Sequence, residues 1–141
     1  MILGGGTGGT IAAWTFTGQG QRVAAIDRKY VGGSCPNIAC LPSKNIIHSA
    51  KVAAYVRRSD EFGIPKSDVT VDMCAVRDRK RRMVSNWNNA YLDNYKKTGA
   101  EFILGSARLI GPKTVEVAVH DGTIRLLRGA KVIINTGRAL P

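Results

Sequence analysis

The sequence predicts an α/β fold in which a parallel sheet carries an additional antiparallel meander of three strands. A glycine-rich turn follows a short apolar stub at the start of the chain. After the first expected helix, a second apolar run ends in Asp27. Further on, the pair Asp121-Gly122 separates two runs of alternating apolar residues, which is a strong hairpin signal. At 141 residues the chain suits one compact domain.

The glycine-rich turn fits the pattern G-x-G-x-x-G, with its three glycines at Gly4, Gly6 and Gly9. In such a turn the first glycine permits a tight bend, the second admits a pyrophosphate, and the third lets helix and strand pack closely. A helix over residues 8–17 would point its free N–H groups at the phosphates. Residues 22–26 are expected to form a buried parallel strand, and Asp27 at its end can hydrogen-bond an adenosine ribose. This order of elements favours a dinucleotide site over a flexible turn.

Two cysteines, Cys35 and Cys40, lie in a run of residues 32–44 that ends in Pro-Ser-Lys. In a regular helix five steps separate the two Cα atoms by about 7.5 Å along the axis. That exceeds the roughly 7 Å that a disulfide can bridge. If the two cysteines pair, the backbone must be locally distorted, and Pro36 and Pro42 favour that distortion. On these residues alone, a redox pair and two inert buried thiols are equally consistent with the run.

The remaining elements follow in order along the chain. A helix is expected over residues 43–57, with Ile47, Ala50 and Ala54 on one face. A longer helix over residues 72–98 would close at Gly99. Near its start, Cys74 is expected to be a small buried residue. The expected strands are residues 101–104 and 132–135 in the parallel sheet, and residues 107–110, 114–119 and 123–127 in the meander.

The net charge of +11 makes nucleic acid one class of partner to consider. The densest basic cluster lies within residues 77–82, interrupted only by Asp78. Apolar residues recur at helical spacing through the same segment, so the charges fall largely on the opposite, solvated face. These apolar residues are Val76, Met83, Trp87, Ala90, Tyr91 and Tyr95. No nucleic-acid-reading motif accompanies the cluster, and a solvated face, or a face that meets a missing neighbour, is therefore the favoured interpretation.

The composition bears on where the protein is located and on whether it binds a metal. No apolar run approaches the ~20 residues of a membrane span, and no secretory leader precedes the glycine turn. Three cysteines without an export signal indicate a reducing, cytoplasmic compartment, in which a dithiol is more plausibly catalytic than structural. No metal site is expected, because the two histidines, His48 and His120, pair with no other motif.

Together, the glycine turn, the strand-end acid and the Cys-x4-Cys-x-Pro-Ser-Lys run resemble the pyridine nucleotide–disulfide oxidoreductases. This flavoprotein family includes dihydrolipoamide dehydrogenase, glutathione reductase and mercuric reductase. Residues 30–35 and 45–51 look closest to bacterial mercuric reductase-like members, and residues 132–137 resemble the family's strand-then-Thr-Gly flavin contact. One departure is Asp27, where many relatives carry glutamate. The resemblance covers essentially the whole chain and implies a Rossmann-like FAD-binding domain.

The resemblance also implies residue roles. Cys40 would face the flavin as the charge-transfer thiolate, and Cys35 would be the interchange thiol that attacks the substrate. Lys44 would lie near the reactive flavin nitrogen, where a cation also favours a thiolate; a plain solvated helix lysine is the alternative. Ala107 would lie near the adenine. The implied FAD-binding residues are Gly4, Gly6, Gly9, Asp27, Gly33, Ser34, Ala107, Thr136 and Gly137.

Members of the resembled family continue with an NAD(P)-binding domain and a dimerisation domain. Residues 1–141 are therefore expected to be a truncated FAD-binding domain, its N-terminal segment, with those two domains absent and weak or no turnover alone. The complete protein would be a homodimeric, FAD-dependent NAD(P)H–disulfide oxidoreductase. Electrons would pass from NAD(P)H through FAD to a Cys35–Cys40 disulfide, and then to a thiol, disulfide or mercuric-ion substrate. A non-catalytic FAD-binding remnant is the alternative, and a basic nucleic-acid-binding module is less favoured.

Overall fold

The computed structural model describes residues 1–138 and contains one mixed sheet of six strands, in the order β5-β4-β3-β2-β1-β6. Strands β2, β1 and β6 are parallel to one another, and β4 and β5 are antiparallel additions. The α/β class, the parallel sheet and the meander predicted from the sequence are confirmed. The elements are β1 (Ile2–Leu3), α1 (Thr7–Gly18), β2 (Ala24–Asp27), α2 (Ser34–Asn37), α3 (Cys40–Arg57), a 3-10 turn (Ser59–Phe62), α4 (Met73–Thr98), β3 (Glu101–Gly111), β4 (Thr114–Val119), β5 (Ile124–Arg128) and β6 (Ile133–Ile134).

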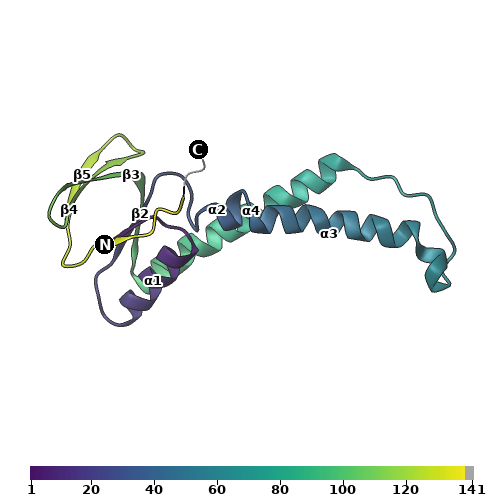
Figure 1. Cartoon of the computed structure of the whole chain (residues 1–141), viewed down its shortest axis with the longest axis horizontal. Coiled ribbons are helices and arrows are strands. Elements are labelled where there is room, and N and C mark those ends of the chain that lie inside the picture. The colour runs from purple at the N-terminus through teal and green to yellow at the C-terminus, as the bar shows by residue number, and fades with distance from the viewer. Residues whose placement is uncertain (139–141) are drawn as a thin grey trace.

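The parallel strands separate two hydrophobic cores. Successive side chains of a strand point to opposite faces, so Ile2 belongs to one core and Leu3 to the other. On the first face α1 and α4 cover the sheet, with Ala13 and Tyr95 almost fully buried. On the second face the meander folds over the sheet and buries Val115 completely. The sheet is thus covered by helices on one side and by strands on the other (Figure 1).

Strand β3 corrects the sequence-based expectation of two separate strands at residues 101–104 and 107–110. It is one strand from Glu101 to Gly111. Its first four residues pair in parallel with β2, ending at the pair Asp27 and Leu104, and from Gly105 onward it pairs with β4 in the antiparallel sense. A Cβ added at Gly105 would lie 2.6 Å from the carbonyl oxygen of Ala118. This glycine therefore lets β4 approach closely where the strand changes partner, and no turn is needed.

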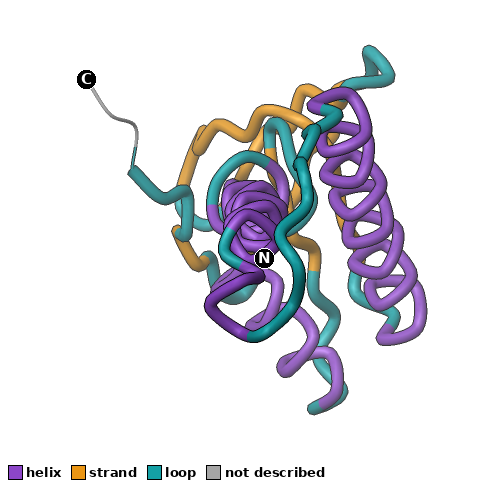
Figure 2. The backbone as a smooth tube through the Cα atoms, turned by 90° about the vertical axis from the view of Figure 1, so that its right-hand side faces the viewer, coloured by secondary structure: helices purple, strands orange, loops and turns teal. Residues whose placement is uncertain are grey.

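Helices α3 and α4 lie side by side and extend beyond the sheet as a long arm (Figure 1). Seen at 90° to that view, helix coils lie in front of the strands (Figure 2). The Asp72 side chain accepts hydrogen bonds from the backbone N–H groups of Cys74 and Ala75 and caps α4. Gly99 closes α4 in the left-handed conformation, at φ 77°. The predicted helix over residues 72–98 is thus confirmed.

The arm departs from expectation in how it packs. Helix α3 begins at Cys40, earlier than predicted, and Ile47, Ala50 and Ala54 are all exposed. The contact with α4 is polar instead: the Arg79 guanidinium donates to the backbone carbonyl of Asn45 and to Oγ of Ser49. The face of α3 that contacts α4 is therefore not the face that carries Ile47, Ala50 and Ala54.

Two further expectations for α4 are wrong. Cys74 is exposed, because the first turn of α4 belongs to the arm and reaches neither core. Of the apolar stripe expected on α4, Tyr95 is buried, whereas Trp87 remains 44% exposed and Ala90 is exposed. The stripe reaches the sheet only toward its C-terminal end, where α4 leads into β3.

Candidate functional site

The glycine turn between β1 and α1 forms a hollow, called here the cradle, which side chains on Gly4, Gly6 and Gly9 would fill. Gly4 has φ +102°, and a Cβ there would lie 2.1 Å from the carbonyl oxygen of Asn135. A Cβ on Gly9 would lie 2.1 Å from the carbonyl oxygen of Gly4. At Gly6 the nearest atom to an added Cβ is the Asn135 amide nitrogen, 3.7 Å away. No side chain caps the start of α1, so its first N–H groups are available to an anion. The residues present therefore fit a diphosphate.

A buried hydrogen-bond relay ties this turn to α4. The Tyr95 hydroxyl donates to Oγ1 of Thr10 at 3.2 Å, and that hydroxyl donates to the carbonyl oxygen of Gly5 at 3.0 Å. Thr10 is fully buried and Tyr95 is 2% exposed. The core on the helix-covered face thus holds the backbone of the glycine turn in place through Tyr95 and Thr10.

Asp27 lies at the end of β2, beside the turn, as predicted. Its Oδ2 accepts from the Gly5 N–H at 2.9 Å, and its Oδ1 accepts from the N–H groups of Lys29 and Tyr30 at 2.9 and 3.1 Å. The carboxylate is therefore oriented by three backbone donors. Besides the ribose contact expected from the sequence, Asp27 braces the glycine turn, a role that its position at a strand end did not reveal.

The cysteine run lies directly against the glycine turn. Gly6 and Gly32 form a parallel backbone bridge, and a Cβ on Gly33 would lie 2.6 Å from the Cα of Gly6. The Asn37 side-chain amide donates to the carbonyl oxygens of Val31 and Gly33, at 2.9 and 2.7 Å, which holds the run in place. The glycine turn and the cysteine run, which are separate in the sequence, thus lie together beyond the carboxyl ends of β1 and β2.

Between the two cysteines the backbone leaves the helical conformation, which is the distortion expected of this run. Cys35 lies in the short helix α2, and Cys40 is the first residue of α3. Ala39, between them, has φ −117° and ψ −99°. Both cysteines are free thiols, Cys35 half-buried and Cys40 exposed. Cys40 lies at the N-terminal, positive end of the α3 dipole, and the first turn of α3 carries no acidic side chain.

Two neighbouring residues, Cys40 and Lys44, together with burial, set the pKa of the Cys35 thiol. A side-chain hydrogen bond with Cys40 raises the pKa of the Cys35 thiol above its ordinary value, and burial and the charge of Cys40 act in the same direction. The positive charge of Lys44 and a backbone hydrogen bond at Cys40 act against this rise. Lys44 lies one turn beyond Cys40 on α3, so the structure brings all three predicted catalytic residues together.

Tyr91 is a neighbour of the dithiol that the sequence did not single out. A Cβ on Gly32 would lie 3.0 Å from Cε1 of the Tyr91 ring, so only glycine leaves room for this ring. Burial raises the pKa of the Tyr91 hydroxyl, and the charge of Cys35 adds to the rise. The sequence placed Tyr91 only on the apolar stripe of α4, and no local signal linked it to the cysteine run.

The other predicted FAD-binding residues occupy different places. The backbone nitrogen of Thr136 lies 2.8 Å from an added Cβ on Gly4, so Thr136 adjoins the cradle. Gly137 follows with φ +71°, and Ser34 is exposed at the start of α2. Ala107 lies on β3 three residues beyond Leu104, the partner of Asp27. At about 3.3 Å per residue it lies roughly 10 Å further along that strand.

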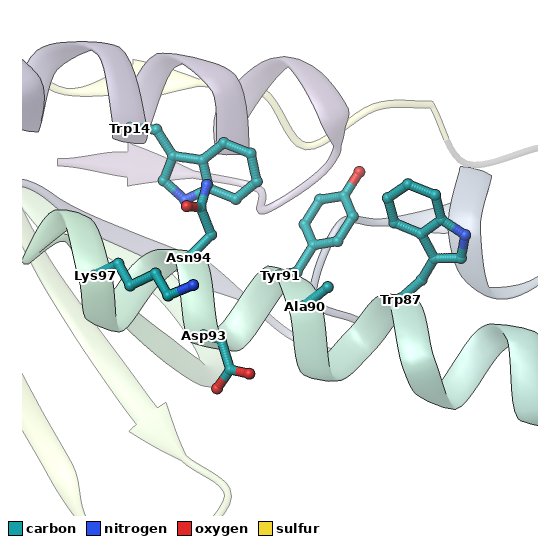
Figure 3. A pocket seen from close by; sticks show the side chains of 7 residues that line it. All are labelled: Trp14, Trp87, Ala90, Tyr91, Asp93, Asn94 and Lys97. Carbon is teal, nitrogen blue, oxygen red and sulfur yellow. The ribbon is translucent and has the colours of Figure 1, made fainter.

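Two clefts adjoin this site but are not lined by its cysteines or by the fingerprint glycines. One, of about 420 Å³, lies between α1 and α4 (Figure 3). Trp14 reaches it from α1, and its ring packs 5.5 Å from that of Tyr91. The second, of about 390 Å³, lies between Asn37 and polar residues of α4. The sequence indicated neither cleft.

The basic cluster of α4 is largely engaged within the arm. Arg77 and Arg81 approach the Asp78 carboxylate at 3.4 and 3.7 Å, and Arg79 holds α3. Across residues 1–138, no group of three or more His, Cys, Asp or Glu could hold a metal ion. Over the same described range, no helix combines the length and apolar character needed to cross a membrane.

Comparison with solved structures agrees with this architecture. The HOCl-induced flavoprotein disulfide reductase RclA from Escherichia coli superimposes with a TM-score of 0.78 and is 28% identical in sequence. The match covers 99% of this chain and 28% of that protein. The fold is therefore the Rossmann-like FAD-binding fold of flavoprotein disulfide reductases.

Comparison with curated proteins points the same way. The dihydrolipoyl dehydrogenase of Bacillus subtilis is 32% identical over 154 aligned residues, which cover 100% of this chain and 32% of the relative. The glutathione reductase of Yarrowia lipolytica is 29% identical, with coverage of 97% and 31%. The chain thus spans about a third of the length of these relatives.

A family model described as pyridine nucleotide-disulphide oxidoreductase matches residues 1–141. Proteins of this family are FAD-dependent oxidoreductases that use NAD(P)H. The matched range includes the glycine cradle, the strand-end acid and the cysteine run. By fold, site and full-length match, the chain belongs to the pyridine nucleotide-disulphide oxidoreductase family.

Proposed function

We propose that residues 1–141 form the N-terminal segment of the FAD-binding domain of a disulfide oxidoreductase, in which Cys35 and Cys40 are the redox-active pair. The backbone bridge between Gly6 and Gly32 carries the proposal, because it joins the nucleotide turn to the dithiol run. NAD(P)-binding and dimerisation domains, and a homodimer, belong to the proposed complete protein. A cytoplasmic location fits free thiols, which persist in reducing compartments.

The residues around the cradle divide the binding of FAD among them. Gly4, Gly6 and Gly9 leave space for the pyrophosphate beside the N–H groups that begin α1. Asp27 would accept from the adenosine ribose while keeping its bond to the turn. The residues proposed to contact the remainder of the cofactor are Gly33, Ser34, Ala107, Thr136 and Gly137. A bound FAD supplies the two-electron reduction of the cysteine pair, with NAD(P)H as the hydride source.

The dithiol itself supports thiol–disulfide exchange. The Cys35 thiolate attacks one sulfur of a substrate disulfide, a mixed disulfide forms, and one substrate thiolate leaves and takes up a proton. Cys40 then attacks the Cys35 sulfur and releases the second substrate thiol. The pair is oxidised to a Cys35–Cys40 disulfide while the substrate gains two electrons and two protons.

Lys44 is the proposed third catalytic residue. Its charge opposes the rise in the pKa of Cys35 and so increases the thiolate fraction at a given pH. The substrate follows from the same chemistry: a disulfide fits by exchange, and a soft ion such as mercuric ion fits because thiolates bind soft metals. Both remain proposals for the complete protein.

Two measurements on the 141-residue chain test this function. The first is FAD titration, followed by flavin fluorescence and by the absorption spectrum; we expect binding. The second is equilibration in glutathione redox buffers followed by thiol trapping and mass spectrometry. We expect a Cys35–Cys40 disulfide that is lost in C35S and C40S and retained in C74S, the matched control on the arm.

The outcomes separate the alternatives. FAD binding without a disulfide between the two cysteines would favour a non-catalytic FAD-binding remnant. A disulfide without FAD binding would contradict the assignment of the glycine turn. Failure of both would refute the proposal as a whole.

A further inference from the structure

The side chain of Asn135 lies in the glycine cradle. Asn135 directly follows β6, and its backbone N–H donates to the carbonyl oxygen of Leu3 at 2.7 Å. Its side-chain Nδ2 donates to the carbonyl oxygen of Gly4 at 3.3 Å. The residue is half-buried. Backbone and side chain are thus both anchored, one to β1 and the other to the turn.

The amide group also faces the start of α1. Its Nδ2 lies 2.9 Å from an added Cβ on Gly9 and 3.7 Å from one on Gly6, and its Oδ1 lies 3.2 Å from one on Gly8. These glycines surround the first turn of the helix, where uncapped N–H groups are available. The Asn135 amide therefore occupies space that is open only because Gly6, Gly8 and Gly9 have no side chains.

A primary amide carries two hydrogens on its nitrogen. Within the described residues, Nδ2 of Asn135 makes a single hydrogen bond, to Gly4. Its second hydrogen is consequently free for a ligand in the cradle. A donor beside a helix N-terminus adds to the N–H groups and the positive dipole that an anion meets there.

We propose that Asn135 is a phosphate-binding residue, which donates its second Nδ2 hydrogen to a diphosphate oxygen of the nucleotide held in the cradle. The inference rests on the proposed function, because it needs a dinucleotide at this turn. It adds a side-chain donor to a site otherwise built from backbone. It also assigns a role to the asparagine that precedes Thr136-Gly137, which the predicted site omits.

Asn135→Ala and Asn135→Asp test this role through ligand binding, without any measurement of catalysis. Alanine removes the donor, whereas aspartate keeps the shape, removes the donor and adds a negative charge. We expect affinity for ADP and FAD to fall about tenfold in N135A, the factor that about 1.4 kcal/mol represents. In N135D we expect a fall of about a hundredfold, diminishing at high salt. Affinity for adenosine, which lacks phosphate, is expected to stay unchanged.

The matched control is Asn86→Asp, which adds the same charge at an exposed position of α4. Calorimetric titration with ADP, FAD and adenosine is combined with thermal unfolding of the ligand-free variants. Equal losses for ADP and adenosine that follow a lowered unfolding temperature would show that Asn135 only braces the turn, and would overturn the proposal. Unchanged ADP affinity would overturn it too. A wild-type chain that binds neither ADP nor FAD would instead refute the proposed function, and this inference with it.

Discussion

At the scale of single residues, the reactivity of Cys35 depends on two side chains that pull in opposite directions. Cys40 raises the pKa of the Cys35 thiol, mainly through a side-chain hydrogen bond, and Lys44 opposes the rise. A thiol reacts as its thiolate, so its rate at neutral pH follows the fraction ionised. Removing Cys40 and removing Lys44 should therefore shift the pKa of Cys35 in opposite directions.

We expect Cys40→Ala to lower the pKa of Cys35, because the hydrogen bond that stabilises the neutral thiol is lost. Alkylation of Cys35 by iodoacetamide, followed by mass spectrometry from pH 6 to 10 (roughly the range in which thiols titrate), gives this pKa directly. Cys74→Ala, on the distant arm, should leave the Cys35 curve unchanged. An unchanged or higher pKa in C40A would contradict the assigned cause.

We expect Lys44→Gln to raise the pKa of Cys35 and slow its alkylation at neutral pH, because a cation that favours the thiolate is removed. Lys44→Arg keeps the charge and should preserve the curve. Lys51→Gln, an exposed lysine further along α3, controls for the change in net charge. If K44Q and K51Q give the same curve, Lys44 has no specific influence on the dithiol.

We expect Gly9→Ala to lower the free energy of unfolding by about 2 kcal/mol, the usual scale of overpacking. The added Cβ would lie 2.1 Å from the Gly4 carbonyl oxygen, and neither atom can move without shifting β1 or α1. Gly18→Ala on the same helix is the control, since nothing lies within 4 Å of its added Cβ. Urea unfolding measures both. Equal stabilities for the two variants would contradict the close packing of the cradle.

The sequence predicted site residues correctly where their role depends on the backbone and not on a side chain. The spacing of Gly4 and Gly9 indicated a close approach of backbone to backbone, and the structure has it. Tyr91 was not predictable as a site residue, because it lies on α4, far along the chain from the cysteine run. Asn135 adjoins the predicted contact residues Thr136 and Gly137, but the sequence does not show that its side chain turns toward the glycine turn. Only the folded sheet and α4 bring them to the turn and to the cysteine run.

At the scale of elements, Arg79 links the two helices of the arm. Arg79 on α4 bonds the Asn45 carbonyl and the Ser49 hydroxyl of α3, while the apolar residues Ile47 and Val52 remain about half exposed. Because these apolar side chains are not buried between the helices, the hydrogen bonds of the Arg79 guanidinium contribute part of the free energy that holds α3 against α4.

We expect Arg79→Met to destabilise the arm by about 1–2 kcal/mol, because charge-assisted hydrogen bonds are lost from a partly exposed site. Amide hydrogen exchange should accelerate in α3 while β2 and β3 remain protected. Arg82→Met, at an exposed position of the same helix, serves as the control. Uniform acceleration throughout the chain would instead indicate that Arg79 supports the whole fold.

Element positions were largely predictable, whereas their packing was not. Asp72 and Gly99 mark the ends of α4, since a capping side chain and a left-handed glycine act locally. The buried side of α3 could not be inferred from Ile47, Ala50 and Ala54, because the partner surface on α4 is polar. The length of β3 was missed for a related reason: a strand can change its neighbour without a turn.

At the scale of the whole molecule, the net charge of +11 acts on every anionic ligand. Charge of one sign steers an opposite charge toward the protein and raises its association rate. We expect the association rate of FAD to fall as ionic strength rises, with a much smaller change in the dissociation rate. Stopped-flow fluorescence at low and high salt measures both rates. An association rate independent of salt would show that the field at the cradle is weak.

The unbroken course of β3 has a mechanical consequence. A hinge needs a segment whose dihedral angles can change freely, yet this strand is held by hydrogen bonds to β2 over its first part and to β4 over its second. The meander also places Val115 and Val117 in one core with Leu3 and Ile26, so swinging it away from the parallel strands would expose that core to water.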